Sequence, residues 1–368
     1  MRIKVLVISD YREFVSPRPE AELFIGLQKA GLDITIMTYP DAAWTPYFKK
    51  AGIRVIESHP VKKFHKPSIK MIRKELEKGG YHILHLFNSK ASSNGIPAAK
   101  KLSVKVLLYR GYAGNVHWYD PAQYLKYLHP RVDKIWCITN EIEETIRKNS
   151  LLIKHKGVTI LKGHDPQWYS HVQPVSSLEQ YRIPADAFTV ICMANVRPMK
   201  GIPYLLKATH HLAPGLPIHF LFAGKGFDKK HIQELISSSP YKNNIHCIGY
   251  VEEPLLLVAA SQVFVLPSIK GEGLSKSTME AMSLGIPPIV TDIPGNKELV
   301  IPEQSGLMVQ AKNASALAKA IFYLYENADL RKTIGQRAKE HMRTDLNISV
   351  TIQKMKELYA KLAGSTTS

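Results

Sequence analysis

The chain of 368 residues holds 49 Lys and Arg against 31 Asp and Glu, which gives a formal net charge of +18. Apolar residues make up 45% and charged residues 22%, a balance typical of globular proteins and not of disordered or fibrous chains. No apolar stretch approaches the roughly 20 residues that span a bilayer, and the three cysteines lie far apart without metal-ligand spacing. These features exclude a disulfide-stapled module and an integral membrane protein, and they predict a cytoplasmic location.

Short, continuous apolar runs alternate with amphipathic helical patterns along the first half of the chain. Runs at 5–8, 33–38, 54–57, 83–87, 105–109 and 135–139 predict strands, and helical patterns lie between several of them, at 20–30, 69–78 and 141–149. Runs that are apolar throughout are typical of a parallel sheet buried on both faces. Residues 1–163 are therefore predicted to form a Rossmann-like domain.

The alternation pauses over 164–187, where Pro, Ser and other polar residues are frequent, which predicts an interdomain linker. It resumes over 188–344, with strands expected at 189–194, 219–223, 244–248, 263–266 and 289–291. Two alternating halves predict an α/β protein with two Rossmann-like parallel-sheet domains. An amphipathic segment around 345–365 predicts a final helix, which could pack back on the N-terminal domain.

The positive charge is concentrated in the first half. Residues 1–163 hold 28 Lys and Arg and 14 Asp and Glu, a net of +14, whereas the other 205 residues hold 21 and 17. A basic amphipathic helix suits an anionic membrane surface, but a solvated helix face gives the same pattern, and both interpretations stay open. Nucleic acid is not an expected partner, because zinc-finger spacing, an aromatic RNA-binding motif and a long basic arm are missing from the sequence. The densest basic cluster comprises Lys62, Lys63, Lys66, Lys70, Arg73 and Lys74.

Loops at the carboxyl ends of parallel strands are the places to look for a ligand site. After the strand at 189–194, Arg197 and Lys200 precede a helix, and Gly201 allows close backbone approach. Two cations at a helix N-terminus predict a phosphate site. After the next strand, the loop from Gly224 to Gly226 has little side-chain bulk, so its backbone can meet a ligand.

The loop after the strand at 263–266 is the most informative. Its carboxylate Glu272 is followed by three residues, Gly273 to Ser275, that offer backbone N–H groups, and a helix is expected to begin near Ser275 or Ser277. Glu280 then lies in the first or second helical turn. Carboxylates accept hydrogen bonds from sugar hydroxyls, so the pair could hold two sugars. The alternative is that Glu280 only complements the helix dipole and Glu272 is simply exposed.

The element Glu, seven residues, Glu, here Glu272 and Glu280 within EGLSKSTMEAM, resembles that of the retaining glycosyltransferases of family 4, which have the GT-B fold. The segments PS, SLGIPPIVTD, PGNKELV and SGLMV around it, and KGHD, NVRPMKG and FAGKG before it, resemble the family in the same order. The resemblance covers most of 160–325 and is weaker over 1–160. It implies a nucleotide-sugar-dependent hexosyltransferase with two domains facing across a cleft. The N-terminal domain would bind the acceptor and the C-terminal domain the nucleotide-sugar.

The resemblance also implies roles for individual residues. Arg197 and Lys200 would hold the diphosphate, Glu280 the ribose hydroxyls and Glu272 the donor sugar. Such enzymes work without a metal, so neither a metal nor a cofactor is expected. The full set of expected donor-binding residues is Arg197, Lys200, Gly224, Gly226, Tyr250, Val251, Gly273, Leu274, Ser275, Lys276 and Glu280, with Tyr250 and Val251 near the base and Lys276 near the phosphate.

The N-terminal half departs from the family in one loop. Many relatives carry a glycine pair after the first strand, whereas the loop 9–20 here has no glycine. Arg12 or Arg18 would replace the missing phosphate contact, or this loop would touch only the acceptor. Relatives also place a polar residue, often His, after a later strand; Arg110 is the preferred counterpart and His117 the second choice. Both are expected catalytic residues together with Glu272. A third candidate is His85, on the strand expected at 83–87, although a histidine on a strand is more typically a packed core residue.

The expected function is transfer of a sugar, with retention, to a glycan or lipid-linked saccharide in cell-surface polysaccharide or lipopolysaccharide assembly. The basic N-terminal half suits an anionic acceptor, or a peripheral position on a membrane that displays the acceptor. One alternative is a non-catalytic GT-B-like protein that binds anionic membrane or nucleic acid, against which the complete motif argues. Another is a GT-B epimerase or an inverting transferase, which would lack this set of motifs.

Overall fold

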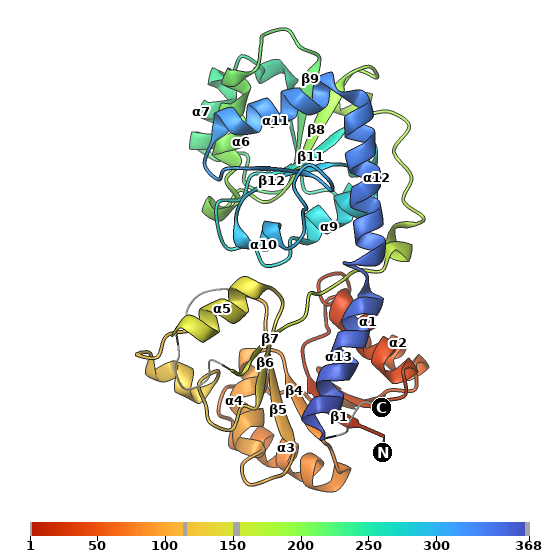
Figure 1. Ribbon diagram of the computed structural model, residues 1–368, viewed down its shortest axis with the longest axis vertical. Coiled ribbons are helices and arrows are strands. Elements are labelled where there is room, and N and C mark those ends of the chain that lie inside the picture. Colours follow the sequence, from red (N-terminus) through yellow and green to blue (C-terminus); the bar gives the residue numbers. More distant parts are fainter. Residues whose placement is uncertain (1, 113–115, 150–154, 365–368) are drawn as a thin grey trace. The chain divides into compact units, whose positions relative to one another are not determined.

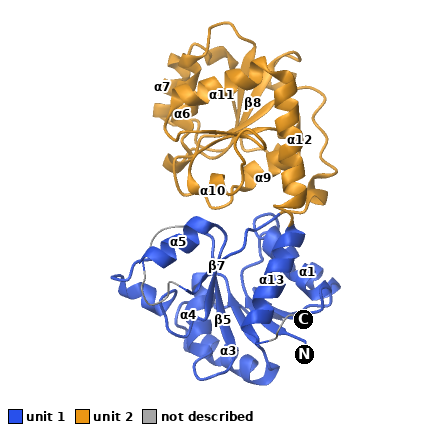
Figure 2. Ribbon diagram, viewed as in Figure 1, with its two compact units in different colours: residues 1–163, 348–368 blue, residues 164–347 orange. Residues whose placement is uncertain are grey.

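The computed structural model describes residues 2–112, 116–149 and 155–364, which form two compact units (Figure 1, Figure 2). Unit 1 spans 1–163 and 348–368, and unit 2 spans 164–347. Each unit contains one sheet whose strands pair in parallel, with helices on both faces. The prediction of two Rossmann-like parallel-sheet domains is confirmed.

The sheet of unit 1 has seven strands in the order β3-β2-β1-β4-β5-β6-β7. Strand order reverses between β1 and β4, so the loops after these two strands diverge, which is where ligands of such sheets bind. The strands are β1 (Lys4–Ile8), β2 (Asp33–Thr38), β3 (Arg54–Glu57), β4 (Ile83–Leu86), β5 (Lys105–Arg110), β6 (Lys134–Cys137) and β7 (Gly157–Thr159). Its helices are α1 (Arg18–Lys29), α2 (Thr45–Lys50), α3 (Lys66–Gly79), α4 (Ser89–Ala98), α5 (Asn140–Asn149) and α13 (Ile348–Leu362), with a 3₁₀ helix η1 (Pro121–Leu125).

The sheet of unit 2 has six strands in the order β10-β9-β8-β11-β12-β13, with the reversal between β8 and β11. The strands are β8 (Phe188–Met193), β9 (Ile218–Ala223), β10 (Ile245–Gly249), β11 (Val263–Leu266), β12 (Pro288–Thr291) and β13 (Leu307–Val309). The helices are α6 (Ile202–Ala208), α7 (Lys230–Ser238), α8 (Pro254–Ala259), α9 (Lys276–Ser283), α10 (Pro294–Lys297), α11 (Ala314–Glu326) and α12 (Ala328–Thr344). Short 3₁₀ helices are η2 (Pro166–Tyr169), η3 (Glu179–Tyr181), η4 (Pro198–Lys200), η5 (Thr209–His211) and η6 (Lys242–Asn244).

The core of each unit is the sheet itself. Val5, Leu6, Val7 and Ile8 of β1 are all fully buried, as are the four residues of β11. A strand that is apolar at every position can be covered by helices on both faces, so the uninterrupted apolar runs place these strands at the centre of their sheets. The structure adds β7 and β13, three-residue strands at sheet edges that are too short to give a periodic signal in the sequence.

The structure assigns two further segments to a unit: the stretch predicted as a linker and the final helix. The stretch 164–187 belongs to unit 2 and does not stand outside both units, because Trp168, Tyr169 and Ile183 bury their side chains there. The final helix α13 belongs to unit 1, where it packs on α1. A side chain at Gly26 of α1 would meet Ile352, since its Cβ would lie 2.2 Å from the Cδ1 atom.

Candidate active site

A cavity of about 380 Å³ lies at the carboxyl ends of the strands of unit 2, around the reversal between β8 and β11. Loops after β8, β9, β10 and β11 and the start of α9 supply its walls. Nine of the twelve donor-side residues expected from the sequence are among the fifteen that line it. The lining is Met193, Ala194, Asn195, Lys200, Ala223, Gly224, Tyr250, Val251, Pro254, Glu272, Leu274, Ser275, Lys276, Ser277 and Glu280.

Close backbone packing joins the loops that form the cavity. Gly201 has a left-handed backbone (φ 65°), and a Cβ there would lie 1.9 Å from the carbonyl oxygen of Pro267. Beside it, the N–H of Ile269 donates to the carbonyl of Met199 at 2.8 Å. The loop after β8 is thereby fixed against the loop after β11. Gly224 makes a similar approach, since its Cβ would lie 2.4 Å from the carbonyl oxygen of Ala194.

This contact between loops brings Lys200 to Glu272. The Lys200 Nζ donates to Glu272 Oε1 at 2.6 Å, and the Ser268 hydroxyl donates to the same oxygen at 2.6 Å. Both charged side chains are largely buried, at 21% and 9% exposure. A buried carboxylate needs such donors, because an uncompensated charge away from water is costly. The second oxygen of Glu272 is not used by these two donors, so a hydroxyl group in the cavity can donate to it.

Glu280 lies on α9, one turn beyond Lys276, and the ammonium of Lys276 donates to Glu280 Oε1. Burial raises the pKa of Glu280, and the charge and hydrogen bond of Lys276 act in the opposite direction. Ser275 caps the helix, accepting from the N–H of Thr278 at 3.4 Å. The first N–H groups of a helix have no intrahelical partner, so the start of α9 offers donors to an anion beside the carboxylates.

Three expected donor residues do not line the cavity, namely Arg197, Gly226 and Gly273. Arg197 is exposed and comes just before η4, three residues ahead of Lys200. The spacing of the two cations was visible in the sequence, but which of them points inward depends on the turn between them. Tyr250 is also strongly exposed, at 73%, and forms part of the rim; the Lys225 ammonium lies 5.6 Å from the centre of its ring.

Two residues that support the site were not singled out from the sequence. Ser268 orients Glu272 through the hydrogen bond described above, and its only sequence signal is the PS pair before the motif. Asn195 lines the cavity and its Oδ1 accepts from the N–H of Lys225 at 2.8 Å, which joins the loops after β8 and β9. The partner of Asn195 lies 30 residues away in another loop, and the bond from Ser268 to Glu272 depends on how their shared loop folds, so residue spacing reveals neither contact.

The expected residues of the N-terminal half lie in unit 1. Arg110 ends β5, is 7% exposed, and its guanidinium carbon lies 4.4 Å from the centre of the Tyr127 ring. His117 follows in the loop after β5 and stacks on Tyr119, with ring centres 4.9 Å apart. Arg110, as the last residue of β5, therefore lies at the carboxyl edge of the sheet of unit 1. His85 is fully buried and bonds the Tyr359 hydroxyl at 2.7 Å; burial lowers its pKa to about 3, so it is a neutral core residue.

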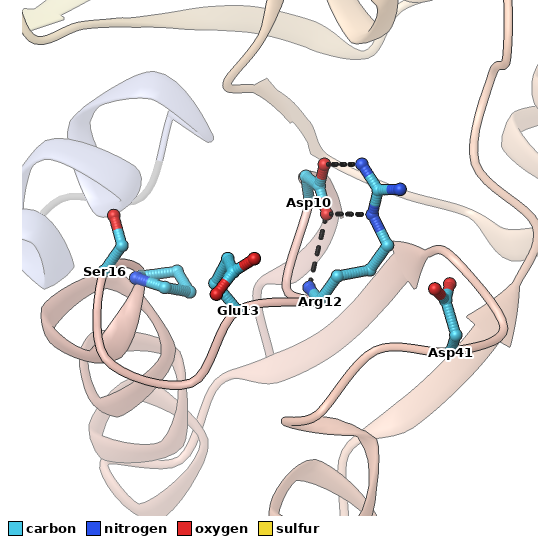
Figure 3. Close-up of a pocket in the computed structure, with 6 residues that line it drawn as sticks. Asp10, Arg12, Glu13, Ser16 and Asp41 are labelled. Carbon is cyan, nitrogen blue, oxygen red and sulfur yellow. Dashed lines mark hydrogen bonds and ion pairs between the residues drawn. The ribbon is translucent and has the colours of Figure 1, made fainter. Parts of the chain in front are cut away.

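The glycine-free loop after β1, together with Asp41 from the loop after β2, lines a second cavity, of about 580 Å³, in unit 1 (Figure 3). Arg12 donates from Nη2 to Asp10 at 2.7 Å and from Nε at 3.0 Å, and these bonds hold the pKa of Asp10 below its ordinary value. The guanidinium carbon of Arg12 also lies 4.1 Å from the centre of the Tyr39 ring. The lining residues are Asp10, Arg12, Glu13, Ser16, Pro17 and Asp41.

The charge of this cavity bears on the role of Arg12. Three carboxylates and one arginine line it, and the arginine is already paired with Asp10. Such a lining repels a diphosphate but can accept hydrogen bonds from hydroxyl groups. Of the two roles that the sequence left open for this loop, contact with an acceptor therefore fits the geometry better than contact with the donor phosphate.

No group of three or more His, Cys, Asp or Glu side chains that could hold a metal ion occurs within 2–112, 116–149 and 155–364. Over the same ranges, every helix is too short or too polar to cross a bilayer.

Comparison with known proteins gives the fold a class. Residues 176–341 match the family model of the glycosyl transferases group 1. A glycosyltransferase from Rickettsia africae superposes with a TM-score of 0.82 at 18% identity, over 99% of this chain and all of that one. The Anabaena protein HepE, solved in complex with UDP, superposes with a TM-score of 0.77 at 17% identity, over 98% and 100%. The fold is therefore GT-B.

Sequence similarity to curated proteins is confined to part of the chain. The O-antigen biosynthesis glycosyltransferase WclY of Escherichia coli is 29% identical over 149 residues, which is 40% of this chain and 40% of that protein. Alignments with the first curated relatives span about two fifths to half of their length. The class that fold and sequence define is thus a GT-B protein whose residues 176–341 are similar to group 1 glycosyl transferases.

Proposed function

We propose that this protein is a metal-independent, retaining glycosyltransferase of family 4 that moves a hexose from a nucleotide-sugar to a carbohydrate hydroxyl. The observation that carries the proposal is the cavity of unit 2, where Lys200, Glu272 and Glu280 converge with the N-terminus of α9. Cations and helix N–H groups suit a diphosphate, and carboxylates suit the hydroxyls of ribose and sugar. The bound UDP in the structural neighbour HepE supports a nucleotide as the ligand.

Positive charge in the cavity would serve the chemistry. When the bond between sugar and diphosphate breaks, negative charge grows on the leaving phosphate. Lys200 and the N–H groups of α9 stabilise that charge from fixed positions, the role a divalent metal has in other transferases. Lys200 is held in place by Glu272, so the same pair can orient the sugar and the phosphate.

The acceptor is proposed to bind unit 1. The cavity at Asp10, Glu13 and Asp41 would accept hydrogen bonds from acceptor hydroxyls, and Arg110, with His117 as the second candidate, would meet the donor sugar. An anionic group on the acceptor would lie outside this carboxylate-lined cavity. Relatives named for O-antigen and colanic acid biosynthesis support a role in the assembly of a cell-surface polysaccharide or lipopolysaccharide.

The proposal is tested by screening UDP-, GDP- and ADP-sugars for nucleotide release in the presence of a chelator, with the product anomer read by NMR. One donor should be turned over, and its nucleotide at 100 times its dissociation constant should stabilise the protein by about 2.7 kcal/mol. Absence of any thermal response to UDP, GDP, ADP and their sugars would contradict the proposal. Activity that disappears with the chelator, or an inverted product, would contradict metal independence or retention.

The substitution Lys200→Ala tests whether the nucleotide binds in the cavity of unit 2. Its removal should weaken nucleotide binding by about tenfold or more, since a hydrogen bond to a charged group contributes about 1.5–3 kcal/mol. Lys207→Ala is the matched control, because Lys207 is exposed on the adjacent helix α6 and does not line the cavity. Lys200→Arg keeps the charge beside Glu272 and separates loss of binding from loss of folding. Equal nucleotide affinity of Lys200→Ala and Lys207→Ala would refute the assignment.

A further inference from the structure

The segment between β3 and α3 exposes apolar side chains among lysines. Val61 and Phe64 are 54% and 49% exposed, and Lys62 and Lys63 between them are exposed as well. Phe64 also has a left-handed backbone (φ 51°), which is unfavourable for a bulky side chain. Of the non-glycine residues with such a backbone in the described part of the chain, Phe64 is the one with an apolar side chain. The fold thus holds an aromatic ring at the surface in a conformation that costs free energy.

Buried polar contacts fix this loop. Asn94 of α4 is fully buried; its Nδ2 donates to the carbonyl of Lys62 and its Oδ1 accepts from the N–H of His65, both at 2.8 Å. The His65 ring bonds the Ser68 hydroxyl at 2.8 Å. The backbone on both sides of Phe64 is therefore anchored, and exposure of the ring is a property of the folded loop.

A line of lysines continues from the loop along α3. Lys66, Lys70 and Lys74 are four residues apart, which places them on one side of the helix, and all three are exposed. Within the part of the chain that the structure describes, neither these three nor Lys62 and Lys63 form an ion pair. These five lysines, called the lysine line below, are Lys62, Lys63, Lys66, Lys70 and Lys74. Their positive charges are thus left for a partner outside the chain.

Arg73, which the sequence grouped with these lysines, is engaged within unit 1. It pairs with Glu77 at 2.8 Å and donates to the carbonyl of Lys100 at 2.9 Å. The carboxylate of Glu75 is taken up by Arg54 in the same way. Both carboxylates of α3 lie in its C-terminal half, are paired with arginines and do not neutralise the lysines of the helix.

The charge distribution at the start of α3 also points to an anionic partner. The first turn holds no acidic residue; Lys66 is its first residue, and Lys62 and Lys63 come just before the N-cap residue His65. Cations at a helix N-terminus are unfavourable, because the helix dipole is positive there. A phosphate group at this position would be attracted both by the lysines and by the helix terminus.

We propose that Val61 and Phe64 insert into the interface of an anionic phospholipid bilayer while Lys62, Lys63, Lys66, Lys70 and Lys74 bind its headgroups. Apolar side chains flanked by lysines favour a bilayer over a soluble polyanion, because a polyanion offers no apolar phase for Phe64. The surface lies in unit 1 and uses none of the residues lining the nucleotide cavity, so it can be tested without donor or acceptor.

Vesicle sedimentation tests the proposal. The full chain should sediment with vesicles of equal amounts of phosphatidylcholine and phosphatidylglycerol, and much less with phosphatidylcholine alone. Val61→Ser with Phe64→Ser should weaken binding about tenfold or more, and Lys66→Gln with Lys70→Gln about 25-fold, from about 1 kcal/mol per lysine. The matched controls Phe322→Ser with Tyr323→Ser and Lys319→Gln with Lys332→Gln, exposed residues of unit 2, should bind as the parent does.

A fluorescent reporter checks insertion directly. Phe64→Trp should shift its emission to the blue on anionic vesicles and be quenched by brominated lipid, whereas Phe322→Trp should not. The proposal is overturned if the parent does not sediment with anionic vesicles, if both sets of variants bind equally, or if heparin binds while vesicles do not. Nucleotide binding by the same variants should be unchanged, so failure here and failure of the proposed transferase activity are distinguishable.

Discussion

Glu272 and Glu280 are both carboxylates that line the cavity of unit 2, but their surroundings differ. Glu272 accepts from both Lys200 and Ser268, whereas Glu280 accepts, among the described residues, from Lys276 alone and has its pKa raised by burial. A raised pKa means that ionised Glu280 opposes folding. We interpret this as the cost of keeping an acceptor-only group ready for a ligand; in the proposed function, the hydroxyls of the nucleotide would supply the donors that stabilise the carboxylate.

Glu280→Gln should therefore separate stability from binding. Because the folded-state pKa lies above the unfolded one, the folded state binds more protons between the two values, and stability falls as pH rises through that window. The variant should gain stability relative to the parent as pH rises above the ordinary glutamate range, and not at lower pH. It should also lose nucleotide affinity, by about tenfold.

Urea unfolding across pH and nucleotide titration measure these two effects. Glu326→Gln, an exposed residue at the end of α11, is the control. If the free energy of unfolding depends on pH in the same way in the parent and in Glu280→Gln, burial of this carboxylate carries no folding cost.

At the scale of elements, the site depends on how closely two loops approach. Gly201, after β8, and Pro267, after β11, are 66 residues apart in the chain, yet Gly201 lies against the carbonyl of Pro267 with no room for a Cβ. This approach positions Lys200 on Glu272. Glycine at 201 is therefore required both for its backbone conformation and for space.

Gly201→Ala and Gly215→Ala separate these two requirements. Both glycines have positive φ, 65° and 85°, but a Cβ at Gly215 meets nothing within 4 Å. Gly215→Ala should cost about 1 kcal/mol of stability. Gly201→Ala adds overpacking and should cost about 2–5 kcal/mol, and it should also weaken nucleotide binding by moving Lys200. Thermal unfolding and nucleotide titration measure the difference; equal effects of the two substitutions would contradict the close approach of the loops.

At the scale of the whole molecule, charge and chemistry are divided between the units. Unit 1 holds 31 Lys and Arg against 15 Asp and Glu, a net of +16, and unit 2 holds 18 against 16. The lysine line and the carboxylate-lined cavity both belong to unit 1, whereas every residue lining the cavity at β8 and β11 belongs to unit 2. Net charge therefore describes the surface of unit 1 and not the proposed nucleotide site.

Unit 2 alone should bind the nucleotide. Residues 164–347 form a continuous stretch with its own buried sheet and all fifteen residues of the cavity. Expressed as a separate chain, this stretch should bind the nucleotide with an affinity within about tenfold of that of the full chain, which is a difference in binding free energy of at most about 1.4 kcal/mol. It should transfer no sugar. Calorimetric titration measures the affinity. A folded fragment without affinity would show that unit 1 completes the nucleotide site.

The sequence by itself determined the two sheets and most of the residues that line the cavity of unit 2. Apolar runs such as 5–8 and 263–266 have to be buried on both faces, and glycines and carboxylates after strand ends have to lie at one edge of a parallel sheet. Such local patterns follow from chain geometry alone. They predicted the eleven strands of four or more residues and nine of the residues that line the cavity of unit 2.

Only the tertiary structure decided how those groups face one another. It directed Lys200 and not Arg197 into the cavity, paired Arg12 with Asp10, engaged Arg73 with Glu77, and left Phe64 exposed beside unpaired lysines. Each of these outcomes depends on contacts between segments or on a turn that sets the direction of a side chain. Whether a charge is free or neutralised is a property of its three-dimensional neighbours, which residue spacing does not specify.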